Sequence, residues 1–213
     1  MNLSNRTKKS KNLKMIIFDL DGVLLNSKIN MKYAWNFAKI ENNLNTPFEN
    51  YFKNIGYPFK KILNKLKINK NQLSIQKSFK KGSIKNINRI KLYPDVKKVL
   101  KYLKKKEYLI GILTSKDKSR TQKILKKFEL YKFFNFIECP NKHLRGKPFP
   151  DCLLKNLKKY SIKSNNATFV GDMLSDYQAA KSAKIKFIFA KYGYGSVKKT
   201  KSIKKMNELL KIF

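Results

Sequence analysis

Four stretches of the chain are continuous apolar runs of strand length. They lie in KMIIFDLDG (14–22), EYLIGILTS (107–115), NNATFVGD (165–172) and KIKFIFA (184–190). Runs of this length without alternation are typical of strands buried on both faces, as in a parallel sheet. A weaker run, FFNFIEC (133–139), predicts one more strand.

Between these runs, apolar residues recur at helical spacing. The helical segments are DVKKVLKYLKKK (95–106), DKSRTQKILKKFEL (117–130), PDCLLKNLKKY (150–160) and DYQAAKSA (176–183). Strand and helix therefore alternate, which predicts an α/β fold with a Rossmann-like doubly wound parallel sheet. The final segment, SIKKMNELLKIF, predicts a last amphipathic helix.

Residues 28–90 interrupt this alternation. They are rich in aromatic, Asn and Lys residues, and they show helical spacing without a convincing strand pattern. We interpret them as a small all-helical cap inserted after the first strand, with residues 13–27 and 91–213 forming the α/β core. Pro94 opens the helix that returns the chain to the core. Residues 1–12 are basic and polar, and they predict a solvated tail.

Composition narrows the choice of function. The 213 residues fit one α/β domain with an insertion, and the 42% apolar content excludes a disordered chain. The net charge of +37 has two interpretations: a polyanion partner or a compositional bias toward Lys. Lys is spread along the chain and Arg is scarce, although Arg is favoured for bidentate phosphate contacts. We therefore predict no dedicated nucleic-acid binding, while the positive field would still steer a small anionic substrate.

Cysteine, histidine and hydropathy exclude several other classes of protein. Cys139 and Cys152 form no CxxC pair, and two buried, reduced thiols are expected. His143 is the only histidine, so a site with several His ligands is excluded. The apolar run that begins at Met15 is too short for a signal or membrane segment. We expect a cytoplasmic protein without a membrane partner.

Reactive side chains follow three of the apolar runs. Asp19 and Asp21 end the first run, Thr114 follows the second, and Asp172 ends the run at 165–172. In open parallel sheets, ligands bind at the carboxyl ends of the strands. We therefore expect these side chains to surround one cleft, together with Lys147 from a loop that precedes a helix.

The two acids of the first run favour a metal. Residues i and i+2 of an extended segment point to the same side, so Asp19 and Asp21 can face one ligand. Two close carboxylates repel unless a cation lies between them, and Asp172 supplies a third acid. Oxygen ligands favour Mg²⁺, which also binds phosphate oxygens. Taken alone, the DxD pattern is equally typical of a turn or a helix cap.

Four segments together resemble a known family. FDLDGVL (18–24), LTSK (113–116), GKPFPD (146–151) and VGDMLSD (170–176) resemble the four motifs of the haloacid dehalogenase-like (HAD) hydrolase superfamily. The helical insertion resembles the cap of its phosphoglycolate phosphatase and β-phosphoglucomutase branch. The resemblance spans about residues 14–195. It implies a HAD core with a helical cap, and an Mg²⁺-dependent phosphatase that acts on a small phosphorylated metabolite.

The resemblance also implies a role for each motif residue. Asp19 would be the nucleophile that forms an aspartyl-phosphate, and Asp21 would be the general acid and then the general base. Asp19, Asp172 and Asp21 would bind the metal, Asp21 through its backbone carbonyl. Thr114 would donate to the phosphoryl oxygens, and Lys147 would neutralise the charge of nucleophile and phosphate.

Further residues are expected around the phosphate. Ser115 and Lys116 are candidate phosphate-binding residues, and Asp176 is expected to orient Lys147 or a metal-bound water. Other interpretations stay open for each residue taken alone. Thr114 and Ser115 are also suited to capping the helix that begins near residue 117. Asp176 is also suited to the N-terminal end of a helix, where a negative charge is favourable.

The cap offers weaker candidates. NIGYPFKKIL (54–63) resembles the substrate loop of the phosphoglycolate phosphatase branch, which makes Gly56, Tyr57 and Pro58 candidate substrate-binding residues. A simple helix–helix turn fits the same pattern. Arg120 has two interpretations, a residue that reaches the cleft or one that decorates a helix, and we favour the second.

Two alternative functions remain. A phosphomutase of the β-phosphoglucomutase type would use the same core, but the cap lacks the His or Arg cluster expected for a sugar phosphate. A non-enzymatic polyanion-binding protein would need a one-sided basic stripe. The expected partner is a small phosphorylated metabolite, and the expected assembly is a monomer or a dimer.

Overall fold

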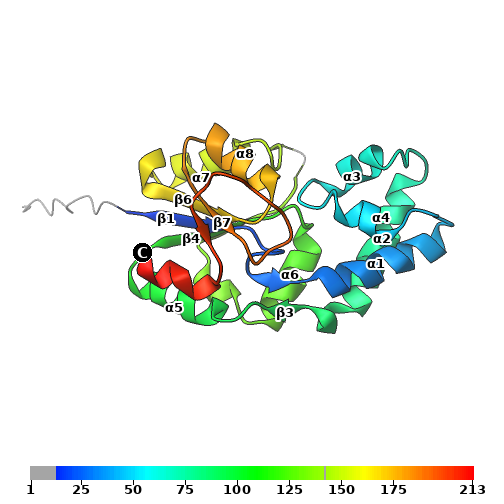
Figure 1. Cartoon of the computed structure of the whole chain (residues 1–213), viewed down its shortest axis with the longest axis horizontal. Helices are drawn as coiled ribbons and strands as arrows, with labels where there is room; N and C mark the ends of the chain where they lie inside the picture. The colour runs from blue at the N-terminus through cyan, green and yellow to red at the C-terminus, as the bar shows by residue number, and fades with distance from the viewer. Residues whose placement is uncertain (1–12, 142) are drawn as a thin grey trace, which may run out of the picture.

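The computed structural model describes residues 13–141 and 143–213. The predicted basic tail, residues 1–12, lies outside the described residues. Figure 1 shows a sheet with helices on both sides, and a separate group of helices beyond one end of that sheet. Within the part of the chain that is described, no helix has the length and hydropathy needed to span a bilayer.

The core is a six-stranded sheet in the order β5-β4-β1-β6-β7-β8. Every pairing in it is parallel. The strands are β1 Met15–Phe18, β4 Leu109–Leu113, β5 Phe136–Glu138, β6 Ala167–Gly171, β7 Lys186–Ala190 and β8 Ser202–Ile203. The predicted doubly wound parallel sheet is confirmed. Because β1 lies between β4 and β6, the strand order reverses there, and such a reversal opens a crevice at the carboxyl ends of the strands.

The apolar character of β1 follows from its central place. Ile16 and Phe18 belong to one buried cluster, and Met15 and Ile17 belong to another on the opposite face. This division follows the alternation of side chains along a strand. A central strand covered on both faces must be apolar at every position, which is why the first run shows no polar alternation.

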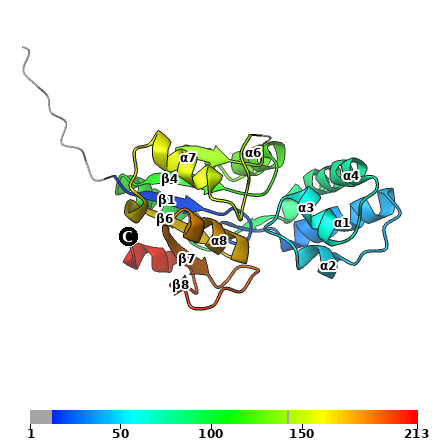
Figure 2. The same cartoon turned by 90° about the horizontal axis from the view of Figure 1, so that it is seen from above.

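Helices cover both faces of the sheet. Buried residues of α5 (Val96–Lys105) and α6 (Lys118–Lys127) pack in the first cluster, and those of α7 (Asp151–Lys159) and α8 (Leu174–Ser182) pack in the second. Figure 1 labels α5 beside the sheet, and Figure 2 shows α6, α7 and α8 around it from a second direction. Short 3-10 turns lie between the larger elements: η2 Tyr131–Phe133 and η3 Ser164–Asn166.

The helical group contains four helices with a buried cluster of their own. They are α1 Lys28–Glu41, α2 Phe48–Phe52, α3 Phe59–Lys65 and α4 Gln72–Lys85, followed by the 3-10 turn η1 Ile87–Arg89. Its centre is aromatic: Trp35 stacks on Tyr51 with ring centroids 4.6 Å apart. This cluster is separate from the two clusters on the faces of the sheet, although Met173 and Tyr194 of the core pack against it.

A short antiparallel ribbon joins the helical group to the core. It pairs β2 (Leu25–Asn26) with β3 (Lys91–Leu92). The sequence did not predict these strands, because two residues are too few to show a period. The ribbon holds the two connecting segments side by side.

The C-terminal segment differs from the prediction. In place of an amphipathic helix, Ser202–Ile203 forms β8 and Met206–Lys211 forms the 3-10 helix η4. The first two residues are used to extend the sheet beside Phe189 and Ala190 of β7. The apolar spacing then suits a tighter turn, since Met206 and Leu209 lie three residues apart and are both buried.

Candidate active site

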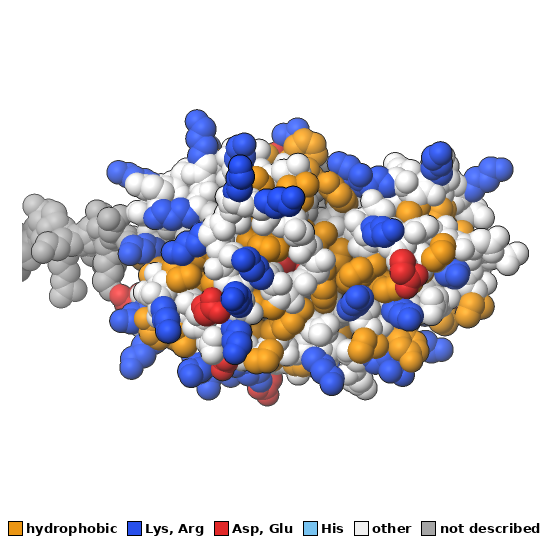
Figure 3. Space-filling model, in the orientation of Figure 1, with side chains coloured by type: hydrophobic (Ala, Val, Ile, Leu, Met, Phe, Trp, Pro, Cys, Tyr) orange, Lys and Arg blue, Asp and Glu red, His pale blue; other side chains and the backbone are white. Residues whose placement is uncertain are grey.

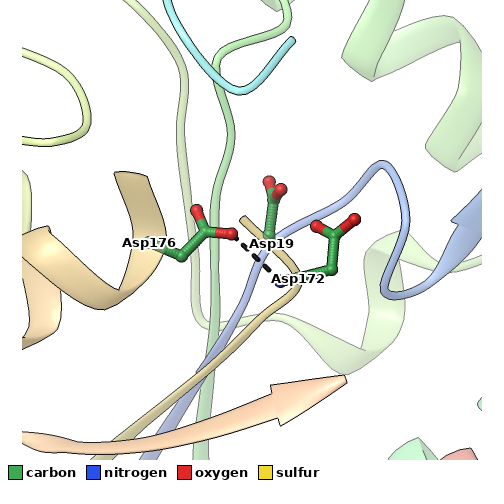
Figure 4. Close-up of side chains that lie close together, drawn as sticks. All are labelled: Asp19, Asp172 and Asp176. Carbon is green, nitrogen blue, oxygen red and sulfur yellow. Dashed lines mark hydrogen bonds between the residues drawn. The ribbon is translucent and has the colours of Figure 1, made fainter. Parts of the chain in front are cut away.

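Three acids from two distant parts of the chain meet at the carboxyl end of the sheet. Asp19 follows β1, Asp172 follows β6, and Asp176 lies in the first turn of α8. One carboxylate oxygen from each lies within 4.8 Å of the others, and all three residues are buried. Figure 4 shows the three side chains next to one another on these elements. The expected convergence of Asp19 and Asp172 therefore occurs, because β1 and β6 are neighbours.

Lys147 is the cation of this cluster. Its Nζ lies 2.9 Å from Asp19 Oδ1 and 2.6 Å from Asp176 Oδ1, and the residue is only 2% exposed. Burial alone would lower the pKa of Lys147, but the charges of Asp176 and Asp19 outweigh burial and raise it. The ammonium is therefore charged at any physiological pH, and it holds the nucleophile candidate and Asp176 together.

One lysine does not balance three buried acids. Burial, with smaller contributions from the charges of Asp176 and Asp21, raises the pKa of Asp19 to about 7 against the opposing charge of Lys147. Burial also raises the pKa of Asp172 well above its ordinary value, with Asp19 and Asp176 adding to the effect. Such a surplus of negative charge is what a bound cation relieves.

The donor set fits a hard divalent cation. Asp172 Oδ2 accepts the Tyr194 backbone N–H at 2.7 Å, while the buried Asp172 Oδ1 has no hydrogen-bond partner among the described residues. That oxygen and the Asp19 carboxylate are both oxygen ligands of the kind Mg²⁺ prefers. The residues present therefore fit a magnesium ion.

Asp176 has a structural and an electrostatic task at once. Its Oδ2 accepts the backbone N–H groups of Asp172 at 3.1 Å and Met173 at 2.9 Å, which caps the start of α8. Its Oδ1 faces Lys147. Both interpretations offered by the sequence, the charge at a helix N-terminus and the partner of Lys147, thus describe the same side chain.

The Asp21 carboxylate lies outside the three-acid cluster. Its Oδ2 is 3.0 Å from Lys116 Nζ, and its Oδ1 accepts the Ser27 hydroxyl at 2.5 Å. Lys116, expected to bind phosphate, lines the cleft but is paired with Asp21. The two acids of the DxD segment therefore have separate cationic partners.

Thr114 and Ser115 do not cap the helix that follows. Asp117 is its N-cap, and the Asp117 side chain accepts the Arg120 backbone N–H. Thr114 Oγ1 accepts the Lys116 backbone N–H at 3.1 Å, and Ser115 Oγ donates to the Gly56 carbonyl at 2.7 Å. Both residues line the cleft, and Ser115 joins the core to the helical group.

The cleft lies between the sheet and the helical group. It brings together the predicted residues Gly56 and Tyr57 with those of the core, while Asp172 and Asp176 are not among its lining residues. Its walls are Asp19, Asp21, Met31, Tyr51, Ile55, Gly56, Tyr57, Phe59, Ile62, Phe79, Thr114, Ser115, Lys116, Arg120, Lys147 and Met173. The favoured interpretation of Arg120 as a surface decoration was wrong: it lines the cleft, and its side chain is 11% exposed.

Two residues of the site carry no sequence signal. Tyr194 donates its backbone N–H to Asp172, and its hydroxyl accepts the Ser27 N–H at 2.6 Å. Ser27 in turn holds Asp21. Sequence spacing could not reveal this link, since 167 residues separate Ser27 from Tyr194.

The two cysteines and the histidine do not line the cleft. Cys152 is buried, Cys139 is partly buried, and His143 is exposed.

Known proteins are similar to this chain in sequence and in fold. The sequence model described as "Haloacid dehalogenase-like hydrolase" matches residues 16–190. A phosphoglycolate phosphatase from Aquifex aeolicus is 29% identical over 184 residues, covering 85% of this chain and 86% of that protein. A glyceraldehyde 3-phosphate phosphatase from Pyrococcus furiosus is 26% identical over 198 residues, covering 86% and 82%. The crystal structure of a predicted phosphoglycolate phosphatase from Haemophilus somnus matches with a TM-score of 0.83 and 26% identity, covering 95% and 99%.

Proposed function

The chain belongs to the haloacid dehalogenase-like hydrolase family, as its motifs predicted, and on that premise we propose that it is an Mg²⁺-dependent phosphatase acting through an aspartyl-phosphate on Asp19. Its substrate is a small phosphorylated metabolite. Similarity to phosphatases over more than four-fifths of the chain supports the reaction class. The buried Asp19–Lys147 pair is the observation that carries the proposed mechanism.

The first half-reaction forms the covalent intermediate. An Asp19 oxygen attacks phosphorus while the bond from phosphorus to the leaving oxygen breaks, and Asp21 gives its proton to that oxygen. Lys147 offsets the negative charge of Asp19 and of the incoming phosphoryl group, and the Thr114 hydroxyl donates to a phosphoryl oxygen. Ser115 and Lys116 line the same part of the cleft.

The second half-reaction restores the protein. Asp21 takes a proton from water, and the water oxygen attacks phosphorus while the bond from phosphorus to the Asp19 oxygen breaks, which releases inorganic phosphate and the Asp19 carboxylate. Ser27 and Lys116 hold the Asp21 carboxylate for this exchange. The proposed magnesium ligands are Asp19, Asp172 and the backbone carbonyl of Asp21. The bound ion would neutralise phosphoryl oxygens and keep the carboxylates ionised.

The helical group is proposed to act as a cap, with residues 28–90 closing over the core formed by 13–27 and 91–213. The contact from Ser115 to Gly56 supports this, since it joins the phosphate end of the cleft to the loop before α3. Gly56 adopts a φ of +92°, and an added Cβ would lie 2.9 Å from Ser175 Oγ. The backbone there can approach the core closely because no side chain intervenes.

Phosphate release tests the proposal. The parent protein, Asp19→Asn and Glu129→Gln are compared over a panel of phosphate esters with Mg²⁺. Glu129 is a matched control, because it is an exposed acid paired with Lys97. We expect Asp19→Asn to lower kcat/KM on the order of 10⁴-fold or more, and Glu129→Gln to leave it unchanged.

Trapping tests the covalent step separately. After rapid acid quenching, mass spectrometry should find an added phosphoryl group on the peptide that contains Asp19 in the parent. Turnover by Asp19→Asn at the parental rate would refute the nucleophile. Isomerisation of a hexose phosphate with little free phosphate would instead show a mutase.

A further inference from the structure

Arg120 occupies the end of the cleft that faces the helical group. It lies in the first turn of α6, and its guanidinium carbon is 5.1 Å from the ring centroid of Phe79 on α4. The side chain is 11% exposed and lines the cleft. A cation from the core is thereby placed beside the wall that the cap supplies.

Only part of the Arg120 guanidinium has a partner within the described residues. Asp117 accepts both the Arg120 backbone N–H and its Nε–H. The terminal Nη groups make no hydrogen bond or ion pair with any residue in the ranges 13–141 and 143–213. A guanidinium has five N–H donors in a planar fork, so donors remain for a ligand in the cleft.

The helical group gives the cleft that Arg120 lines a mainly apolar wall. Its apolar residues are Met31, Ile55, Phe59, Ile62 and Phe79, and the guanidinium lies over the last of these. Charged hydrogen bonds are stronger in such a setting than in water. A neutral leaving group with many hydroxyls would find few partners here, and unpaired polar groups are costly to bury.

Tyr51 supplies the polar neighbour. It lines the same cleft, and its ring is fixed by stacking on Trp35. Its ring centroid lies 5.2 Å from that of Phe79, the ring over which Arg120 lies, so both residues pack on the same side chain. Burial raises the pKa of the Tyr51 hydroxyl. Its hydroxyl therefore stays protonated and is able to donate.

The other two cations that line the cleft are already paired with carboxylates. Lys147 is shared by Asp19 and Asp176, and Lys116 is paired with Asp21. We propose that Arg120, assisted by the Tyr51 hydroxyl, determines specificity by binding a second anionic group on the leaving side of the substrate. This inference rests on the proposed phosphatase function and adds the substrate class: phosphate esters or anhydrides whose leaving group carries a carboxylate or a second phosphate.

Substrate pairs test this role. kcat/KM is measured with Mg²⁺ on phosphoglycolate, which carries a carboxylate, on pyrophosphate, which carries a second phosphate, and on glyceraldehyde 3-phosphate, whose leaving group is neutral. Arg120→Gln should lower kcat/KM on the preferred anionic substrate roughly 10- to 100-fold, mainly through KM, since charged hydrogen bonds are worth about 1.5–3 kcal/mol. The value on glyceraldehyde 3-phosphate should change by less than about threefold.

Two further variants separate the role of the Arg120 charge from an effect of substitution alone. Arg120→Lys should restore part of the loss, because it keeps the charge without the fork. Arg89→Gln is the matched control, because Arg89 also lies over an aromatic ring, Tyr33, but is exposed on the cap and does not line the cleft. Equal loss on neutral and anionic substrates would overturn the inference, since it would show that Arg120 only ties α6 to Phe79. No loss on either would also overturn it.

Binding gives a readout independent of turnover. By calorimetry with Mg²⁺, the parent should bind phosphonoacetate more tightly than methylphosphonate, and Arg120→Gln should abolish that difference. Equal binding of the two by the parent would overturn the inference even if the protein is a phosphatase. If the parent releases phosphate from no substrate, the proposed function fails first, and the inference fails with it.

Discussion

At the scale of single residues, the shared ammonium of Lys147 organises the site. Two buried carboxylates, Asp19 and Asp176, depend on it. Removing one partner of a buried ion pair leaves an uncompensated charge, which costs far more than the pair contributes. The same group therefore supports both the proposed chemistry and the folded state.

Lys147→Met tests this dependence, because Met keeps the apolar stem and removes the charge. We expect kcat/KM to fall on the order of 10²- to 10³-fold, since a preorganised cation opposite the phosphoryl group is lost. We also expect the free energy of unfolding, measured in urea, to fall by about 3–5 kcal/mol. Lys97→Met serves as control, because Lys97 pairs with Glu129 at the surface and the two side chains are 45% and 73% exposed. Activity within about tenfold of the parent would contradict the assignment.

Asp176→Asn separates the two tasks of Asp176. The amide oxygen can still accept the N–H groups of Asp172 and Met173, so the start of α8 should stay intact. The charge facing Lys147 is lost, and we expect kcat to fall about 10- to 100-fold. Asp176→Ala should in addition lower the melting temperature. If the Asn and Ala variants melt together, the capping role is refuted.

At the scale of elements, the segment after β7 packs closely against Asp172, the acid that follows β6. An added Cβ at Gly193 would lie 2.3 Å from Asp172 Cβ, and one at Gly22 would lie 2.0 Å from Asp172 Oδ2. Gly22 also has a φ of +85°, which other residues rarely adopt. Backbone from two loops therefore fixes the orientation of the Asp172 side chain.

Gly193→Ala should disturb the proposed metal site without removing a ligand. The new methyl group displaces Asp172, and we expect Mg²⁺ affinity measured by calorimetry to fall about 10- to 100-fold. Gly146→Ala is the matched control, since its added Cβ would meet only Pro58 Cγ at 4.0 Å. Unchanged Mg²⁺ affinity in Gly193→Ala would show that Asp172 is free to adjust or does not bind the ion.

Tyr194 connects the same segment to the cap. Its ring lies edge-on to Phe52 of α2 with centroids 5.3 Å apart, while its hydroxyl accepts the Ser27 N–H. Tyr194→Phe keeps the ring contact and leaves that N–H without its acceptor. We expect a loss of about 1–2 kcal/mol in stability and a lower kcat with little change in KM. In a double mutant with Ser27→Ala, the two effects on kcat should be less than additive if both act through Asp21.

At the scale of the whole molecule, positive charge lies at the surface and a cluster of acids is buried inside. Figure 3 shows Lys and Arg side chains scattered over the visible face of both the core and the helical group. The buried acids have the opposite sign, with three carboxylates around one ammonium. An outer positive field with a buried acidic centre is suited to drawing in an anionic substrate and holding a cation.

The surplus of buried acid predicts how Mg²⁺ and pH act together on stability. Burial raises the pKa of Asp19 to about 7, above its ordinary value of 3.8. Without metal, the stability that its protonated form contributes is complete below the unfolded-state pKa and is lost as pH rises through about 7. Mg²⁺ needs ionised carboxylates, so its binding to the folded state strengthens over the same range.

Thermal melting at about pH 6 and about pH 8 checks this linkage. We expect the rise in melting temperature on adding saturating Mg²⁺ to be larger at the higher pH. Asp172→Asn should remove most of the rise at both. An equal rise at the two pH values in the parent would contradict the placement of the ion among these acids.

The sequence by itself determined which segments form the strands of the sheet and which reactive residues follow them. Continuous apolar runs mark strands buried on both faces, and reactive residues at their ends must meet at one edge when the strands are parallel neighbours. Asp19, Thr114 and Asp172 could be placed together on that ground, because each needs only its own strand and the order of strands. The family was predicted from the four motifs, because these are short segments that can be read directly along the chain.

Only the tertiary structure decided how these residues are partnered. The resemblance left Lys147 and a metal-bound water as alternative partners of Asp176, and the structure pairs it with Lys147. The pairs of Asp21 with Lys116 and of Tyr194 with Asp172 could be assigned only when packing fixed the side chains. Local patterns report on neighbours within a turn or a strand, whereas these pairs depend on register, on loop paths and on which helix covers which face. The cleft position of Arg120 is of the same kind, because it requires α4 of the cap to lie against α6.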